Sequence, residues 1–179
     1  ASSIIRKTLP YPSGCEISTA TCRDNAALIL SVIDIKHAST TCEIDAARDL
    51  FREYERWLGL DLCFQGFEEE LSALPGKYAP PNGRLFLAYA DYKPAGCVAL
   101  RKLGPGICEM KRLFVRDNFR GLRIGVLLIE KLIRTAREIG YEKMKLDAYS
   151  AKMGRAVDLY RRYGFHEIPA YYDNPYDGV

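Results

Sequence analysis

The sequence lacks the spacings that metal sites and disulfide frameworks use. Of its 179 residues, six are cysteine and two are histidine. No two cysteines form a Cys-x-x-Cys pair, and His37 lies far from His166, so zinc-ligand spacing is absent. A chain of this length can bury a core without cross-links. We therefore predict no metal and no disulfide framework.

Long apolar runs and a strong charge of one sign are also missing. No apolar stretch reaches the roughly 20 residues of a membrane-spanning helix, and residues 1–14 lack the apolar centre of a secretory signal. The net charge is +3, with acidic and basic residues mixed along the chain. We expect neither nucleic-acid binding nor membrane association as a main function, and a cytoplasmic location is the default prediction.

The order of periodic segments predicts one α+β domain over residues 28–179. Residues 1–27 contain Pro10, Pro12 and Gly14, and we predict an irregular N-terminal extension there. Helical spacing predicts a long helix after a cap at Thr40 or Thr41. The predicted strands cover 28–35, 84–89, 95–103, 107–115, 143–149 and 165–168, and the predicted helices cover 44–58, 64–74, 127–139 and 156–163.

Turn lengths predict how these strands pair. Short turns at 93–94 and 104–106 predict an antiparallel meander of three strands. A helix between the strands 107–115 and 143–149 allows that pair to run parallel. The expected architecture is one mixed, mostly antiparallel sheet with helices on both faces.

The segment after Val115 is typical of a phosphate-binding loop. Gly121 and Gly125 frame a turn between a strand and a helix, where exposed backbone N–H groups bind anions. Arg120 and Arg123 can add charge-assisted contacts. The glycines alone are equally consistent with a tight turn of no function, and neither a P-loop nor a three-glycine dinucleotide motif is present.

Three segments together resemble the GNAT superfamily of N-acetyltransferases: Glu109–Val115, Arg120–Gly125 and Leu159–Phe165. The resemblance implies acetyl-CoA as cosubstrate, an amine acceptor and no metal. Two positions depart from the family pattern. Arg123 stands where glycine is usual, and Met153 stands where many members carry an asparagine that hydrogen-bonds CoA.

The resemblance also implies where CoA lies. The pyrophosphate would rest on the backbone of residues 122–126, and the pantetheine arm would pair with residues 113 and 115. A backbone N–H near Phe114 or Val115 would stabilise the oxyanion. The implied cofactor-binding residues are Leu113, Phe114, Val115, Arg120, Gly121, Leu122, Arg123, Ile124, Gly125 and Val126.

Two residues take catalytic roles under the resemblance. Glu109 stands where several members place a carboxylate base, although a salt bridge with Lys111 or Arg112 is the structural alternative. Tyr160 matches the tyrosine that protonates the leaving thiolate, and a core tyrosine is its alternative. Cys108 adjoins Glu109, but strand alternation points it to the opposite face, and we do not expect an acyl-cysteine intermediate.

The acceptor is expected near the first helices and the C-terminal segment. Arg112 and Tyr149 are candidate acceptor contacts, as are Tyr171 and Tyr172 after the last predicted strand. Further aromatic candidates are Tyr54, Trp57, Phe64 and Tyr78. The family continues with another strand after this tail. Either the given sequence stops before that strand, or the corresponding sheet position is open or filled by another chain, which would make a homodimer.

The leading hypothesis is an N-acetyltransferase that acts on a small-molecule amine by direct attack. A protein lysine or N-terminal acetyltransferase is the alternative enzyme, and a long acceptor groove would favour it. A non-catalytic acyl-CoA-binding module is the alternative outside enzymes.

Overall fold

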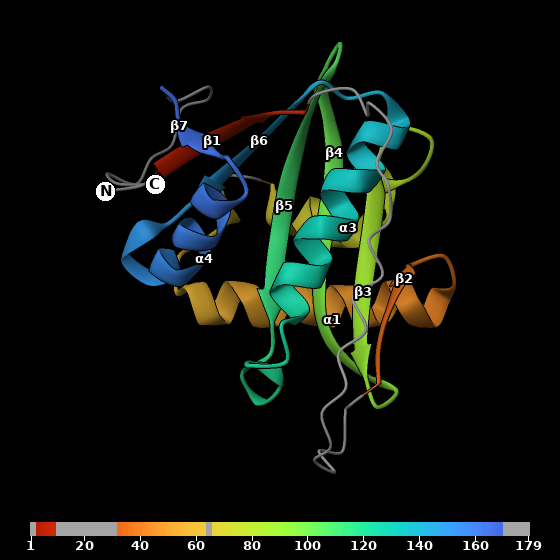
Figure 1. Cartoon of the computed structure of the whole chain (residues 1–179). Coiled ribbons are helices and arrows are strands. Elements are labelled where there is room, and N and C mark those ends of the chain that lie inside the picture. The colour runs from red at the N-terminus through yellow and green to blue at the C-terminus, as the bar shows by residue number, and fades with distance from the viewer. Residues whose placement is uncertain (1–2, 10–31, 64–65, 170–179) are drawn as a thin grey trace, which may run out of the picture.

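The structure, a computed structural model, describes residues 3–9, 32–63 and 66–169 (Figure 1). Its centre is a seven-stranded sheet in the order β2-β3-β4-β5-β6-β1-β7. The strands are β1 (Ser3–Thr8), β2 (Ile33–His37), β3 (Arg84–Ala90), β4 (Lys93–Gly104), β5 (Ile107–Val115), β6 (Lys143–Ala148) and β7 (His166–Glu167). The α-helices are α1 (Thr41–Leu58), α2 (Phe67–Ser72), α3 (Ile124–Ile139) and α4 (Ser150–Arg162), and short 3₁₀ turns lie at η2 (Gly76–Tyr78) and η3 (Asp117–Phe119).

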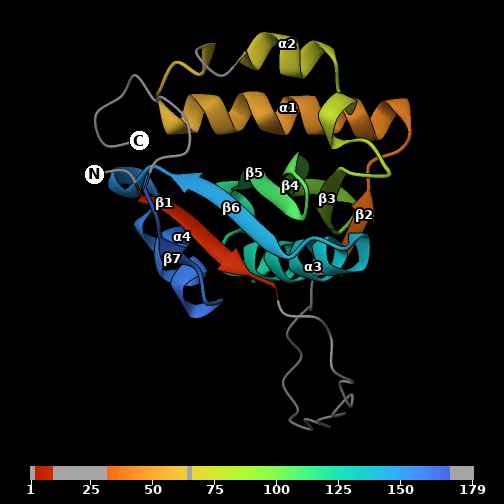
Figure 2. The same ribbon diagram turned by 90° about the horizontal axis from the view of Figure 1, so that it is seen from above.

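The predicted α+β class is confirmed. Strands β5 and β6 run parallel, and the other neighbouring strands are antiparallel. Helices α1 and α2 lie on one face of the sheet, and α3 and α4 lie on the other (Figure 2).

Helix α1 begins and ends where the residue types predict. Thr40 accepts a hydrogen bond from the Glu43 N–H and the Glu43 side chain returns one to the Thr40 N–H, a capping box. Gly59 ends the helix in the left-handed conformation with φ 67°. The buried face carries Ile44, Ala47, Leu50, Phe51, Tyr54 and Leu58, all in the predicted helical spacing.

Several predicted boundaries were wrong. The first predicted strand is seen at Ile33–His37, while residues 28–31 lie outside the described part of the chain. The turn placed at Lys93-Pro94 lies at Asp91 and Tyr92, whose φ angles of 47° and 64° suit a two-residue hairpin turn. Pro94 instead stands at a register shift in β4, where a missing N–H is tolerated.

Residues 3–8 form a strand, so the predicted irregular extension was wrong for that segment. Strand β1 pairs with β6 at six positions and with β7 at two. The residues of β1 alone give little indication of a strand, because the strand is formed by pairing with residues 135 or more positions away in the sequence. Thr8, for example, pairs with Lys143. Strand β1 thus fills the sheet position that we expected to be open or filled by another chain. Most of residues 9–27 lie outside the described part of the chain.

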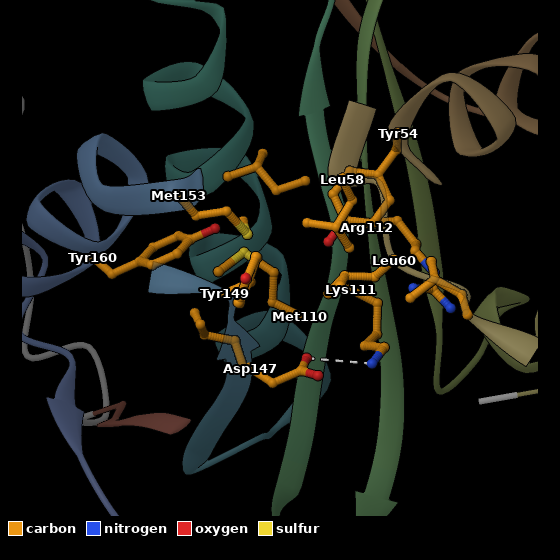
Figure 3. Close-up of a pocket in the computed structure, with 13 residues that line it drawn as sticks. Tyr54, Leu58, Leu60, Met110, Lys111, Arg112, Asp147, Tyr149, Met153 and Tyr160 are labelled. Atoms are coloured by element: carbon orange, nitrogen blue, oxygen red, sulfur yellow. Dashed lines mark hydrogen bonds and ion pairs between the residues drawn. The ribbon is translucent and has the colours of Figure 1, made fainter. Parts of the chain in front are cut away.

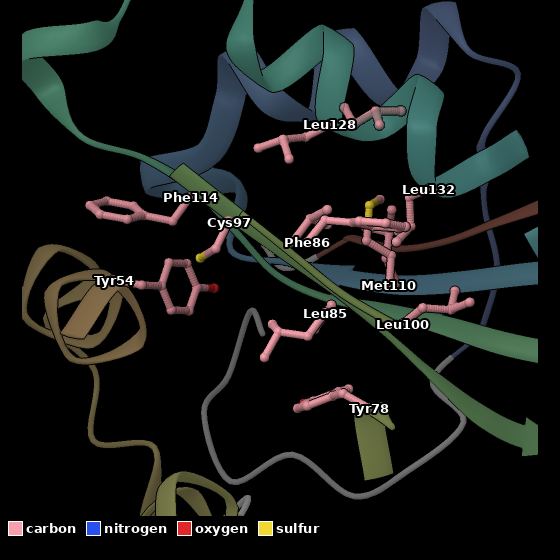
Figure 4. Packing of buried hydrophobic residues seen from close by; sticks show 14 of the residues in the cluster. Tyr54, Tyr78, Leu85, Phe86, Cys97, Leu100, Met110, Phe114, Leu128 and Leu132 are labelled. Carbon is pink, nitrogen blue, oxygen red and sulfur yellow. The ribbon is translucent and has the colours of Figure 1, made fainter. Parts of the chain in front are cut away.

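Buried side chains form a core on both faces of the sheet. Towards α1, Tyr54 lies near Cys97 and Phe114, and towards α3, Leu128 and Leu132 lie over the sheet (Figure 4). Within the described residues, no helix is both long enough and apolar enough to cross a membrane. Side chains of β5 are thus packed on both faces of the sheet.

Candidate active site

The parallel strands β5 and β6 separate halfway along their length. Their pairing runs from Ile107↔Lys143 to Glu109↔Lys145 and includes no later residue. On its other side, β5 carries an extra residue between Lys111 and Phe114 relative to β4, a β-bulge. Leu113 therefore lacks a β4 partner in the ladder, and the backbone beyond Glu109 is turned towards the gap between β5 and β6.

A buried ion pair holds this bulge. Arg112 takes φ 57°, a strained value for a side chain with a Cβ. Its guanidinium donates two hydrogen bonds to Glu70, at 3.0 and 3.2 Å, and both side chains are about 2% exposed. Glu70 also contacts Lys77 at 2.8 Å and accepts a hydrogen bond from Tyr78. The charge of Arg112, predicted to meet the acceptor, is thus engaged within the protein.

The predicted phosphate loop lies at the start of α3. Gly121 has φ 91°, and the helix begins after Arg123, which has φ 59° and forms no side-chain cap. A Cβ at Gly121 would meet nothing within 4 Å, and one at Gly125 would meet only the Val115 side chain at 3.9 Å. The space above these glycines is therefore open, as backbone contact with a phosphate requires.

A cleft of about 790 Å³ extends from this loop along the gap between β5 and α4. It is lined by nine of the ten predicted cofactor residues, Leu113, Phe114, Val115, Arg120, Gly121, Arg123, Ile124, Gly125 and Val126, whereas Leu122 is 38% exposed and does not line it. The opposite wall comes from α4 and includes Lys152 and Arg155. These two cations were not predicted, although their i, i+3 spacing near a phosphate loop is a usable signal.

A second, enclosed pocket of about 30 Å³ lies deeper in the gap. Leu113 and Met153 line both spaces, so the pocket adjoins the cleft. Its polar lining comprises Tyr54, Lys111, Arg112, Asp147, Tyr149 and Tyr160 (Figure 3). Of the predicted acceptor residues, Arg112 and Tyr149 therefore line it, while Tyr171 and Tyr172 lie outside the described residues, as does Phe64.

The predicted base Glu109 does not line either space. Its side chain is 0% exposed and accepts a hydrogen bond from Arg101, with Lys111 Nζ at 4.0 Å. The carboxylate that does line the pocket is Asp147, 12% exposed and 3.3 Å from Lys111 Nζ. Sequence reasoning missed Asp147 because its position depends on the separation of β5 from β6.

Tyr160 lies on α4 across the pocket from this ion pair (Figure 3). Burial, with smaller effects from Tyr54 and Asp147, raises the pKa of Tyr160 well above its ordinary value. Burial likewise raises the pKa of Tyr54 to about 12, despite an opposing effect of Arg112. Both phenols therefore keep their protons at neutral pH.

Cys108 and the remaining aromatic candidates have structural surroundings. Cys108 is buried and its pKa is raised by burial, which disfavours the thiolate that a nucleophile needs. Tyr78 is buried against Glu70, and Trp57 lines the larger cleft beside Arg120. Within the described part of the chain, no group of three histidine, cysteine or acidic side chains could hold a metal ion.

Comparison with known proteins gives consistent matches. The model of the acetyltransferase (GNAT) family matches residues 44–165. An uncharacterised N-acetyltransferase of Schizosaccharomyces pombe is 40% identical, over 83% of this chain and 92% of its own length.

Solved structures agree in fold. A GNAT-family acetyltransferase of Staphylococcus aureus superposes with a TM-score of 0.67 at 23% identity, over 76% of this chain and 85% of that one. The PaiA N-acetyltransferase of Thermoplasma acidophilum, solved with coenzyme A, gives 0.59 at 15% identity, over 73% and 88%. The family match, the 40% identical relative and the shared fold all agree: this chain belongs to the GNAT family of acetyltransferases.

Proposed function

We propose that the protein transfers an acetyl group from acetyl-CoA to the amine of a small molecule by direct attack. The observation that carries this proposal is the meeting of two spaces at Leu113 and Met153. The larger has a phosphate-binding loop at one end, and the smaller is polar and enclosed. That a fold relative was solved with coenzyme A supports the assignment of the larger cleft to CoA.

In this proposal CoA lies along the larger cleft with its pyrophosphate on the start of α3. The N–H groups of residues 124–126, together with Arg120 and Arg123, would hold the phosphates. The pantetheine arm would follow the β5 backbone beyond the bulge, so that the thioester reaches Leu113. A backbone N–H at Phe114 or Val115 would then stabilise the oxyanion.

We assign the base to Asp147 rather than Glu109. Asp147 lines the pocket that would receive the amine, whereas Glu109 is buried against Arg101. The ammonium group loses one proton to Asp147, and the resulting amine attacks the thioester carbonyl carbon. As the tetrahedral intermediate collapses, the C–S bond breaks and the second nitrogen proton leaves to solvent. Tyr160 gives its proton to the leaving thiolate and is reprotonated from solvent. Its raised pKa keeps that proton available.

The smaller pocket can receive only the amine end of an acceptor. A volume of about 30 Å³ holds only a few atoms, which suits the amine end of a compact molecule. A protein acceptor would need a long groove leading to the pocket. A non-catalytic CoA-binding module would need neither the Asp147 carboxylate nor a protonated tyrosine at the junction.

The test is a thiol-release assay with acetyl-CoA and a panel of amino acids, polyamines, amino sugars and peptides. We expect amine-stimulated release that Tyr160→Phe and Asp147→Asn each reduce by about 10²-fold or more. Glu109→Gln is the matched carboxylate control. If that control abolishes release while Asp147→Asn does not, the base is assigned wrongly.

A CoA-induced rise in melting temperature, measured for every variant, shows whether its cofactor cleft is intact. Binding of CoA without release for any amine in the panel would favour the non-catalytic module. Release with peptides but with no small amine would favour the protein acetyltransferase. In wild type we expect no loss of rate from Tyr160 ionisation up to pH 9, because its pKa is raised.

A further inference from the structure

A third cleft, of about 520 Å³, lies at the end of α3 that is remote from the phosphate loop. Its lining residues come from the end of β2, the segment before β3, β3 itself and the second half of α3, and none of them lines the CoA cleft or the enclosed pocket. Along α3, Gly125 of the CoA cleft and Thr135 of this cleft are about 15 Å apart. A cleft of this volume suits a small organic molecule.

Strand and helix periodicity bring the charged side chains of this cleft together. Arg84 and Phe86 are two positions apart on β3, and His37 pairs directly with Phe86 across the β2–β3 ladder. These three side chains therefore point to the same face of the sheet, the one that α3 covers (Figure 2). Lys131 and Glu138 are seven positions apart on α3 and both line the cleft, so they share one side of the helix.

The guanidinium of Arg84 is held in place by its own loop. Its Nη1 donates hydrogen bonds to the carbonyl oxygens of Pro81, at 3.0 Å, and of Gly83. Its Nε and Nη2 have no hydrogen-bond partner, and Arg84 has no acidic partner, among the described residues. The Nε–Nη2 edge of a guanidinium matches the two oxygens of a carboxylate.

Lys131 brings a second positive charge to the same place. Its Nζ lies 5.5 Å from the centre of the Phe86 ring, a cation–π contact. The His37 ring packs edge-on against that same ring, with the ring centres 6.0 Å apart. In the part of the chain that the structure describes, Lys131 forms no ion pair. Arg84 and Lys131 are both half-buried, so they are less screened by water than cations on an open surface.

His37 has a polar atom without a partner. Its Nε2 is buried and has no hydrogen-bond partner in the described ranges. Burial, together with the charge of Arg84, lowers the pKa of His37 below 6.5, so the imidazole is neutral at pH 7. A buried nitrogen in this state costs free energy. An oxygen that enters between Arg84 and Lys131 would give it a partner.

The charges of the lining select the kind of anion. Its ionised side chains are Arg84, Lys131 and Glu138, which leaves one net positive charge. Glu138 and the nearby C-terminal end of α3, which carries partial negative charge, disfavour an anion of higher charge. Pro81 and Ile139 add apolar surface to the cleft. A singly charged carboxylate with an apolar body is therefore the class of ligand that fits.

We propose that this cleft is a second ligand site, which binds a small monocarboxylate with an apolar body. The carboxylate lies on the free edge of Arg84, beside Lys131 and His37, and the body of the ligand packs against Pro81 and Ile139. The site is separate from the CoA cleft and does not depend on the proposed reaction.

The first test measures binding by calorimetry in the presence of saturating CoA, which occupies the phosphate loop. The probes are benzoate and hexanoate, each compared with its neutral amide, benzamide or hexanamide. At least one carboxylate should bind 10-fold or more tightly than its amide, because it makes charge-assisted hydrogen bonds that the amide cannot make. Equal binding of acid and amide in both pairs, or no binding of either carboxylate, would overturn the proposal.

The second test uses variants. Lys131→Met and Arg84→Met should each weaken binding of the preferred carboxylate by at least 10-fold, with CoA binding unchanged. Because Arg84 also anchors its loop, Lys131→Met, which removes no hydrogen bond within the described residues, keeps the test independent of folding. Arg134→Met, which removes an exposed cation of α3 outside the cleft, is the matched control. Equal weakening in the control would mean a general effect of charge and would contradict a local site.

Amide chemical shifts in NMR spectra locate the bound carboxylate. Its addition should shift the signals of residues 37, 84, 86 and 131, with or without CoA. Shifts confined to residues 121–126 would place the anion on the phosphate loop and refute the second site.

Discussion

At the scale of single residues, Arg123 combines a backbone cost with a charge that suits a phosphate. It caps α3 with φ 59°, a conformation that costs an L-residue about 1 kcal/mol or more relative to glycine. Its side chain lines the large cleft. In the proposed function, Arg123 therefore trades stability for ligand binding, as expected where strain lies at a functional site.

Arg123→Gly should stabilise the free protein and weaken CoA binding. Relief of about 1 kcal/mol corresponds to a rise of roughly 2–4 °C in melting temperature for a chain of this size. Loss of one phosphate contact should raise the Kd for CoA by roughly 5- to 20-fold. Thermal melts and calorimetry measure the two effects separately.

Arg123→Asn provides the control, because asparagine tolerates the left-handed conformation without carrying a charge. It should weaken CoA binding like the glycine variant. Undiminished affinity in both variants would show that Arg123 does not contact CoA.

At the scale of elements, the Arg112–Glu70 pair joins the bulge of β5 to α2. Burial alone would raise the pKa of Glu70, but the charges and hydrogen bonds of Arg112 and Lys77 outweigh it and lower the pKa from 4.5 to about 2. Breaking a buried pair of this kind costs about 3–5 kcal/mol. The bulge, and with it the position of Leu113, should therefore depend on the ionisation of Glu70.

The stability contributed by this pair should be lost in acid. Because the pKa of Glu70 is lower in the folded than in the unfolded protein, its ionisation stabilises the folded state at pH values above 4.5. The contribution is on the order of 3 kcal/mol, and it disappears as pH falls towards 2. Urea unfolding from pH 7 to pH 2.5 should show this decline in wild type. In Glu70→Gln stability should be lower at pH 7 and should fall less with acid.

Glu68→Gln, on the same helix, is the matched control, since Glu68 pairs with Arg52 at an exposed site. It should follow the wild-type curve. A Glu70→Gln curve parallel to that of wild type would mean that the pair does not control acid stability.

Local patterns predicted the elements, whereas non-local pairing determined the site. Helix α1 follows from its apolar spacing and from Thr40 with Glu43, all within one segment. The bulge at Arg112 depends on Glu70, 42 residues away, and no local pattern reveals it. Asp147 likewise becomes a pocket residue only because β5 and β6 separate beyond Glu109 and Lys145.

At the scale of the whole molecule, the order of the sheet places the N-terminal strand between β6 and β7, against the end of α4. Strand β1 lies between β6 and β7 and is the described neighbour of β7. Lys7 donates a hydrogen bond to the Tyr163 carbonyl and lies 6.0 Å from the centre of the Phe165 ring, so β1 also anchors the end of α4, the helix that carries Tyr160.

Removal of residues 1–9 should therefore affect assembly, stability and activity together. The edge of β6 would lose six paired positions, and an unpaired edge recruits strands from other molecules. We expect the shortened chain to melt at a lower temperature, to dimerise or aggregate in light scattering, and to lose most of its thiol release.

A peptide of residues 1–9, added to the shortened chain, tests whether its defects come from the missing strand pairing or from nonspecific misfolding. Because main-chain hydrogen bonds dominate strand addition, the peptide should restore the wild-type oligomeric state and part of the activity. A shortened chain with the oligomeric state, melting temperature and thiol release of wild type would show that neither the sheet nor the site depends on β1.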